Sequence, residues 1–412
     1  MTLVAPLTPI TPGFIWLAAS AGAVSLLTPC VFPMIPITVS YFTSRAEHER
    51  PAALRSALVF ALGIIATFTA LGLALAVFVG ATGASAFAAN PWVNLGLAAL
   101  FVAFALNLFG VWQVTVPSGV LTALDARVGR SGGPVLMGLL FTLTSFTCTA
   151  PFVGTVLVSA AAGQWQMPVI GMLAYSTVFA APFFVLALVP RWISRLPRSG
   201  SWLSTVKIVM GLVELAAAFK FLSNVDLVWH WGVVTRPVVL GSWIALAAIT
   251  VVVLRFKPVA LVPAAIGVWL ALGLAGKTRL GELEAFLPPA ATTELAWRLN
   301  DLPGALAAAR RDGKPVFIDF TGYTCTNCRW MEANIFSRPE VETALGRYEL
   351  ARLFTDGDGP AYEAQQAYQE SHYNTVALPL YALVAPDGHT IATFAGLTRD
   401  PAAFVAFLRQ TQ

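Results

Sequence analysis

Four cysteines are the side chains in this sequence best suited to covalent chemistry, and they occur in two different settings. Cys325 and Cys328 form a C-x-x-C motif in a segment of ordinary soluble character, whereas Cys30 and Cys148 each lie in a long apolar segment. Four cysteines can build a structural disulfide framework or a zinc site. Zinc is disfavoured because the four histidines are scattered and two of the thiols lie among apolar residues. The chemistry left to consider is that of thiols and disulfides.

The C-x-x-C motif lies between a predicted strand and a predicted helix. Residues 314–320 form an apolar run that predicts a buried strand, and residues 325–336 predict a helix with Cys325 at its N-terminus. The helix dipole and the free N–H groups at this end favour a thiolate, the attacking species in disulfide exchange. We therefore expect Cys325 to be the nucleophile and Cys328, one turn later, the resolving thiol. The alternative is a structural C-x-x-C or half of a zinc knuckle.

The elements after the motif follow the order of a thioredoxin-like α/β domain. Helices are predicted over 338–346, 361–371 and 400–409, and strands over 350–354, 378–384 and 390–394. A proline just before a central strand usually argues against that strand, but thioredoxins place a cis-proline there, facing the redox pair. We assign this role to Pro379.

The two cysteines in apolar segments share a proline-rich context. Cys30 lies in the run 28–36, whose prolines cannot continue a regular helix, and both Cys30 and Cys148 have a proline three residues later. The prolines of these two motifs are Pro29, Pro33, Pro36 and Pro151. Inverted repeats with broken helices form the central sites of membrane carriers. We therefore expect a functional pair of Cys30 and Cys148; the alternative is that each is a small apolar helix residue.

The composition indicates a membrane protein. Hydrophobic residues make up 57% of the 412 residues and charged residues 11%, against roughly 25% charged in a typical soluble protein. This argues against a soluble enzyme, a disordered chain and a nucleic-acid binder. With about 20 apolar residues needed per crossing, eight spans are predicted over 13–42, 54–80, 91–113, 133–162, 168–190, 202–222, 236–254 and 258–276. The predicted fold class is an α-helical polytopic membrane domain, an inverted 3+3 repeat with broken helices, followed by the α/β thioredoxin-like domain.

The charges divide the chain and predict its orientation. Residues 1–289 hold 15 Lys and Arg against 7 Asp and Glu, whereas residues 290–412 hold 10 against 14. Lys and Arg concentrate in the odd-numbered loops, which places those loops in the cytoplasm and both termini outside it. No Lys or Arg precedes Arg45, so we expect the first span to be retained rather than cleaved as a signal peptide. The predicted domains are an extracytoplasmic N-terminus (1–12), a transmembrane domain (13–276), a linker (277–293) that acts as a semi-flexible tether, and a periplasmic thioredoxin-like domain (294–412).

With these motifs, the sequence resembles the DsbD/CcdA family of transmembrane thiol:disulfide reductases. The run 28–36 matches the first intramembrane cysteine motif of the family, and the run 148–152 matches the second, although many members have proline where Thr147 stands. The resemblance covers nearly the whole chain and implies a protein-disulfide reductase of the bacterial inner membrane. It implies electron flow from cytoplasmic thioredoxin through Cys30 and Cys148 to Cys325 and Cys328. The implied acceptors are oxidised periplasmic thioredoxin-fold or cytochrome c maturation proteins, and no cofactor is expected beyond the two redox-active disulfides.

Some residues around the C-x-x-C motif agree with the family and others depart from it. Asp319 resembles the buried acid of thioredoxins, and Glu332 lies on the helix face of Cys328; both are expected to tune the cysteine pKa and to carry protons. The alternative for Glu332 is a solvated helix residue. Tyr323 and Thr324 precede Cys325, where many thioredoxins have Trp, which could change the docking surface. The chain is also expected to lack the N-terminal immunoglobulin-like domain of full-length members.

Two other functions use similar parts. A quinone-linked thiol oxidase also pairs membrane cysteines with an external C-x-x-C, but it needs a second C-x-x-C at the membrane surface. A solute transporter could carry a regulatory thioredoxin domain, but Glu214 and Lys220 are the main ionisable groups at span depth, too few for a charged-solute path. The sequence leaves the periplasmic client, any separate shuttle protein and the oligomeric state open.

Overall fold

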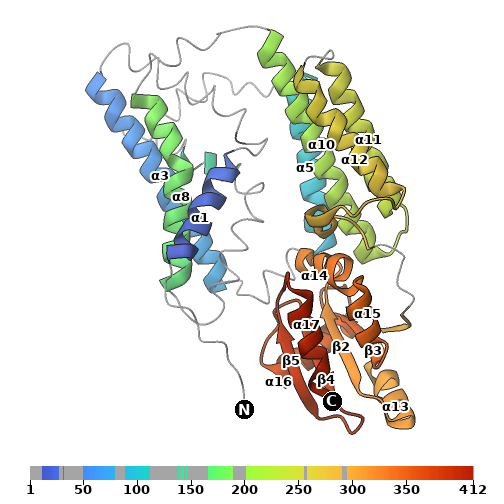
Figure 1. Ribbon diagram of the computed structural model, residues 1–412. Coiled ribbons are helices and arrows are strands. Elements are labelled where there is room, and N and C mark those ends of the chain that lie inside the picture. The colour runs from blue at the N-terminus through green and yellow to red at the C-terminus, as the bar shows by residue number, and fades with distance from the viewer. Residues whose placement is uncertain are drawn as a thin grey trace. The chain divides into compact units, whose positions relative to one another are not determined.

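The computed structural model describes residues 12–26, 31, 50–78, 89–111, 138–139, 141–142, 145, 166–188, 201–254, 258–289 and 295–411. The chain divides into two compact units (Figure 1). The first comprises Met1–Ala84 and Ala103–Glu214, and the second comprises Ser85–Val102 and Leu215–Gln412.

Helices form the described part of the first unit. Helix α8 (Gln166–Leu188) packs against both α1 (Pro12–Ser25) and α3 (Arg50–Phe78), and these helices lie side by side in Figure 1. Gly22 allows α1 and α8 to approach closely, because a Cβ at this position would lie 2.4 Å from the carbonyl oxygen of Tyr175. The Tyr175 hydroxyl donates a hydrogen bond to Ser25 Oγ at 2.8 Å. Aromatic side chains fill the core of this unit, among them Phe60, Phe68, Phe141, Tyr175 and Phe179.

Described helices lie in seven of the eight predicted spans. Besides α1, α3 and α8, these helices are α5 (Pro91–Leu108), α10 (Ser201–Trp229), α11 (Arg236–Val253) and α12 (Leu261–Leu274). A 3₁₀ turn, η1 (Pro258–Ala260), precedes α12. Helices α3, α5, α10 and α11 contain segments of at least 18 residues that are long and apolar enough to cross a membrane. The apolar segments described in the other three helices are shorter, namely Gly13–Ser25, Val169–Val185 and Pro258–Leu274. Most of the predicted fourth span, and the predicted break in the first, lie outside the described residues. The inverted repeat therefore stays a prediction.

Helix α10 ends later than the sequence indicates, at Trp229 instead of residue 222. The extension contains Asp226, which marks a polar loop in the sequence pattern. In the structure its buried carboxylate accepts hydrogen bonds from the backbone N–H groups of Val233 and Val234, both at 3.1 Å. The helix therefore continues past Asp226, and the aspartate stabilises the backbone that follows the last turn.

The C-terminal part of the second unit is a five-stranded mixed sheet. Its strands are β1 (Trp297–Leu299), β2 (Val316–Thr321), β3 (Glu349–Phe354), β4 (Leu380–Val384) and β5 (Thr390–Ala395), in the order β1-β3-β2-β4-β5. The β1–β3 and β3–β2 pairs are parallel, and the β2–β4 and β4–β5 pairs are antiparallel. Every residue of the central strand β2 is buried. This confirms the thioredoxin-like α/β fold; the sequence analysis did not predict β1 or the helix that follows it.

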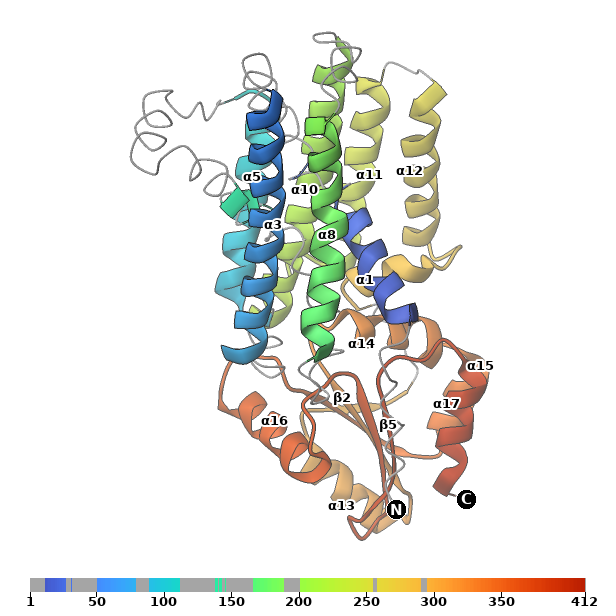
Figure 2. The ribbon, with the colours of Figure 1, turned by 90° about the vertical axis from the view of Figure 1, so that its left-hand side faces the viewer.

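Helices cover both faces of this sheet (Figure 2). On one face, α13 (Leu302–Asp312) and α16 (Pro360–Tyr373) pack on a core that includes Ile318 and Phe320. On the other face, α14 (Thr326–Met331), α15 (Pro339–Leu345) and α17 (Pro401–Leu408) pack on Phe317 and Tyr381. The predicted helix over 325–336 is therefore α14 followed by a π-helical turn, η3 (Glu332–Phe336). The Leu378–Pro379 peptide bond is cis, as predicted.

The predicted tether is packed over part of its length. A 3₁₀ helix, η2 (Gly281–Phe286), lies within it, and the flanking Leu280 and Leu287 are each 1% exposed in a cluster with Leu240 and Leu270. Glu284 also accepts a bidentate ion pair from Arg236, at 2.7 and 2.9 Å. The expectation of a semi-flexible tether is therefore wrong for these residues, because their leucines bury apolar surface.

Candidate redox site

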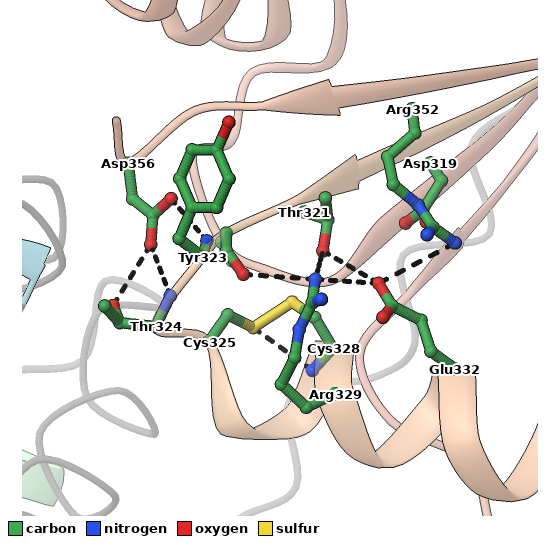
Figure 3. Close-up of a disulfide and its surroundings, with 12 residues drawn as sticks. Asp319, Thr321, Tyr323, Thr324, Cys325, Cys328, Arg329, Glu332, Arg352 and Asp356 are labelled. Carbon is green, nitrogen blue, oxygen red and sulfur yellow. Dashed lines mark hydrogen bonds and ion pairs between the residues drawn. A yellow bond between two sulfur atoms is a disulfide. The ribbon is translucent and has the colours of Figure 1, made fainter. Parts of the chain in front are cut away.

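Cys325 and Cys328 form a disulfide at the start of α14, just beyond the end of β2 (Figure 3). Their Cα atoms are 5.3 Å apart. Cys325 is the N-cap residue of the helix and is half-buried, whereas Cys328 is only 1% exposed. The backbone N–H of Cys328 donates to Cys325 Sγ at 3.2 Å. An incoming thiolate can therefore reach Cys325, and the same N–H group can stabilise a thiolate there.

Asp356 holds the loop that leads into the disulfide. Its carboxylate accepts hydrogen bonds from the backbone N–H groups of Tyr323 (2.6 Å) and Thr324 (3.0 Å), and from the Thr324 hydroxyl (3.1 Å). Burial raises the pKa of Asp356, and these hydrogen bonds oppose that rise. Gly322 is required for the close approach, since a Cβ there would lie 2.5 Å from the Asp356 carboxylate. The sequence analysis missed Asp356; its one signal is its position two residues after a buried strand that runs parallel to β2.

A cluster of two acids and two arginines lies beside the disulfide (Figure 3). Arg352 Nε donates to Asp319 Oδ2 at 2.8 Å, and Arg352 Nη2 lies 3.7 Å from Glu332 Oε1. The buried Arg329 donates to the same Glu332 oxygen at 2.8 Å and to the Thr321 hydroxyl at 3.0 Å. Glu332 thus lies between two guanidinium groups with only 14% of its side chain exposed, which rules out the solvated helix residue.

Asp319 is the acid of this cluster with a strongly shifted pKa. The pKa of Asp319 is raised to about 6: burial raises it, Arg352 opposes the rise, and the nearby Glu332 adds to it. The carboxyl group can therefore bind or release a proton near neutral pH. Sequence reasoning found both acids but missed Arg329 and Arg352. Arg329 directly follows Cys328, whereas Arg352 is found only through the strand register that places it opposite Asp319.

Of the remaining predicted site residues, Tyr323 lies in the described part of the chain. The Tyr323 ring stacks on Phe354 with centroids 4.0 Å apart, and burial raises the pKa of its hydroxyl. Outside the described residues lie Cys30, Cys148, Pro29, Pro33, Pro36 and Pro151, so their pairing and roles stay predictions. In the described part of the chain, no three His, Cys, Asp or Glu residues gather as a metal site would require.

Comparisons with known proteins match most of the chain. The family described as the cytochrome C biogenesis protein transmembrane domain matches residues 13–226, and a thioredoxin-like family matches residues 297–386. Thiol:disulfide interchange protein DsbD of Vibrio cholerae serotype O1 is 30% identical over 78% of this chain and 55% of that protein. Thiol:disulfide interchange protein DsbD 1 of Pseudomonas aeruginosa is 27% identical over 89% of this chain and 65% of that protein.

The chain spans less than two thirds of the length of both relatives. The solution structure of a thioredoxin from Thermus thermophilus matches 29% of this chain and 88% of that chain at 26% identity, with a TM-score of 0.25. The transmembrane-domain match alone covers more than half of the chain. The chain therefore belongs to the DsbD family, whose membrane part is the cytochrome C biogenesis protein transmembrane domain.

Proposed function

We propose that this chain is a transmembrane protein-disulfide reductase of the bacterial inner membrane. In this proposal Cys30 and Cys148 receive electrons from cytoplasmic thioredoxin and pass them to Cys325 and Cys328, which reduce oxidised extracytoplasmic proteins. The clients would be cytochrome c maturation proteins or thioredoxin-fold proteins of redox homeostasis. One observation carries the proposal: a helix-capping disulfide with one accessible and one buried sulfur, in a chain of the DsbD family.

Each transfer is a pair of thiol–disulfide exchanges. A thiolate of the reduced membrane pair attacks Cys325 Sγ, the Cys325–Cys328 bond breaks, and Cys328 leaves as a thiolate that takes up a proton. The second membrane thiol then attacks the mixed disulfide and releases Cys325. Two electrons and two protons reach the external pair, and the membrane pair becomes a disulfide. The reduced Cys325 repeats this chemistry on a client, and Cys328 resolves the product.

The acids beside the disulfide supply the proton chemistry in this proposal. Asp319, with a pKa raised to about 6 by burial, is protonated in part of the molecules near neutral pH. It can give a proton to the leaving Cys328 thiolate and take one back when Cys328 attacks as the resolving thiol. Glu332 and its two arginines are the charged groups beside Asp319, so they influence its pKa.

The proposal is tested with the full chain in proteoliposomes. Reduced thioredoxin is supplied at the cytoplasmic face, and alkylation followed by mass spectrometry reads the redox state of Cys325 and Cys328. We expect the external pair to become reduced in the wild type and to stay oxidised in the Cys30→Ala and Cys148→Ala variants. Reduction that persists in either variant would contradict the route through the membrane pair. Oxidation driven by added quinone, with no reduction by thioredoxin, would favour the oxidase.

A further inference from the structure

The geometry points to a docking contact for the thioredoxin-like domain that is distinct from its redox residues. We propose that the loop 230–235 between α10 and α11 receives this domain, with His230 as the residue that positions Tyr323 and thereby Cys325. The inference rests on the proposed function, because the membrane pair must reduce the Cys325–Cys328 disulfide before the domain is released to a client.

The contact joins two side chains from distant parts of the chain. His230 Nε2 lies 3.2 Å from the Tyr323 hydroxyl, and the two rings meet edge to face with centroids 5.2 Å apart. Tyr323 precedes Cys325 by two residues. Because the side chains touch, the thioredoxin-like domain lies on the same side of the membrane as the loop 230–235. This supports an extracytoplasmic domain, since the charge pattern places that loop outside.

The loop 230–235 is built to present His230. The residue adopts a φ of 56°, which is uncommon for a residue other than glycine. Asp226 fixes the following backbone through its hydrogen bonds to Val233 and Val234. On the preceding side, Trp229 contacts both Trp92 and Trp231, with ring centroids 5.1 and 5.0 Å apart. The backbone on both sides of the exposed His230 is therefore fixed by packing and hydrogen bonds.

Tyr323 is held as firmly on its own domain. Its ring stacks on Phe354, its backbone N–H donates to Asp356, and its hydroxyl lies 3.3 Å from that of Tyr362. The hydroxyl therefore faces His230 without any rearrangement of the redox loop. Both partners are pre-organised, which reduces the entropy lost on docking.

A second and stronger contact of the thioredoxin-like domain is with η2. There Ala285 packs in the core formed by Trp330 and Met331, and Asn334 Nδ2 donates to the carbonyl oxygen of Gly281 at 3.2 Å. The ion pair between Arg236 and the buried Glu284 links η2 to the start of α11. The His230–Tyr323 contact, by contrast, is one exposed hydrogen bond, of a kind that shifts an equilibrium about fivefold. It is therefore the contact that can open when Cys325 must turn to a client.

The test measures reduction of the Cys325–Cys328 disulfide by the membrane pair, in the full chain in proteoliposomes. His230→Phe keeps an aromatic ring but removes the ring nitrogens, and Tyr323→Phe keeps the stack but removes the hydroxyl. We expect each variant to be slowed about fivefold. The double variant should be no slower than either single variant, because both remove the same contact. His230→Gln, which retains a hydrogen-bonding group, should recover part of the rate.

Controls separate this inference from the proposed function. His389→Phe changes an exposed histidine of the thioredoxin-like domain, away from Tyr323, and should leave the rate unchanged. Direct reduction of the disulfide by dithiothreitol should be the same in His230→Phe as in the wild type. Wild-type rates in His230→Phe, or additive slowing in the double variant, would overturn the docking contact. Absence of any transfer in the wild type would instead overturn the proposed function.

Discussion

Arg352 connects the two acids beside the disulfide: its Nε donates to Asp319 at 2.8 Å, and its Nη2 lies 3.7 Å from Glu332. Its guanidinium also lies over the ring of Trp297, 4.1 Å from the centroid. One side chain therefore balances the charge of both carboxylates and itself stacks on an aromatic ring. The protonation of Asp319 and the stability of the sheet are linked through this residue.

Replacing Arg352 by Met should destabilise the thioredoxin-like domain by roughly 3 kcal/mol, because it leaves the buried Asp319 without its partner. It should also raise the pKa of Asp319 further, since Arg352 opposes the effect of burial. Pulse proteolysis of the full chain in urea should show a lower unfolding midpoint. Arg347→Met removes an exposed arginine of the same domain and should behave as the wild type; an equal loss in both variants would contradict the assigned role.

Asp319 makes stability depend on pH in a defined direction. Its pKa is raised from 3.8 to about 6 in the folded protein, so the unfolded chain releases the proton first. The stability that Asp319 contributes is therefore fully present below about pH 4, is lost between about pH 4 and pH 6, and changes little above pH 6, by on the order of 3 kcal/mol in all. The Asp319→Asn variant should lack the part of the fall that comes from Asp319.

Urea midpoints between pH 4 and pH 7 measure the effect. The exposed Asp358 provides the matched control, since Asp358→Asn should retain the wild-type dependence. An equal pH dependence in the wild type and in Asp319→Asn would show that Asp319 is not the titrating group.

The two thiols of the reduced protein should differ in reactivity. Cys325 is half-buried at a helix N-terminus, whereas Cys328 is 1% exposed. Iodoacetamide at mildly acidic pH should therefore label Cys325 first, and peptide mass spectrometry distinguishes the two sites. Faster labelling of Cys328 would reverse the assignment. A Cys328→Ser variant should also accumulate mixed disulfides with its clients through Cys325.

The Arg236–Glu284 pair should control access to the segment around η2. Arg236→Gln leaves the buried Glu284 without its partner and should cost roughly 3 kcal/mol, which opens the segment to trypsin at Lys277 and Arg279. Arg399→Gln breaks the exposed pair with Glu282, whose partners are 69% and 67% exposed. That variant should be cleaved at nearly the wild-type rate, because exposed pairs contribute little. Equal cleavage of the two variants would argue against a structural role for Glu284.

Local patterns in the sequence were enough to predict the redox motif. The apolar run before the C-x-x-C motif became β2, Cys325 caps α14, and the Leu378–Pro379 bond is cis. Each of these features depends on residues close together in the chain. Helix α13 had similar signals that were overlooked, namely the capping Asp301 and the left-handed Gly313 after its last turn.

The partners of the predicted acids could not be found in this way. Arg352 faces Asp319 through the β2–β3 register across 33 residues, and Asp356 reaches the redox loop from the end of β3. Different β2–β3 registers would place different residues of β3 opposite Asp319, and the sequence alone does not select one register. The glycines and prolines of the segment 276–293 suggested an open tether, whereas Leu280 and Leu287 decided its packing.

The burial of Cys328 limits how this domain can be used. With one accessible sulfur in the pair, a donor and an acceptor must use Cys325 in turn and cannot bind it together. The domain should therefore follow ping-pong kinetics, in which the donor leaves before the acceptor arrives. An oxidised client in excess could also dock on the oxidised domain without reacting and would then keep the membrane pair from Cys325, so the abundance of clients, as well as the supply of electrons, would set the rate of turnover.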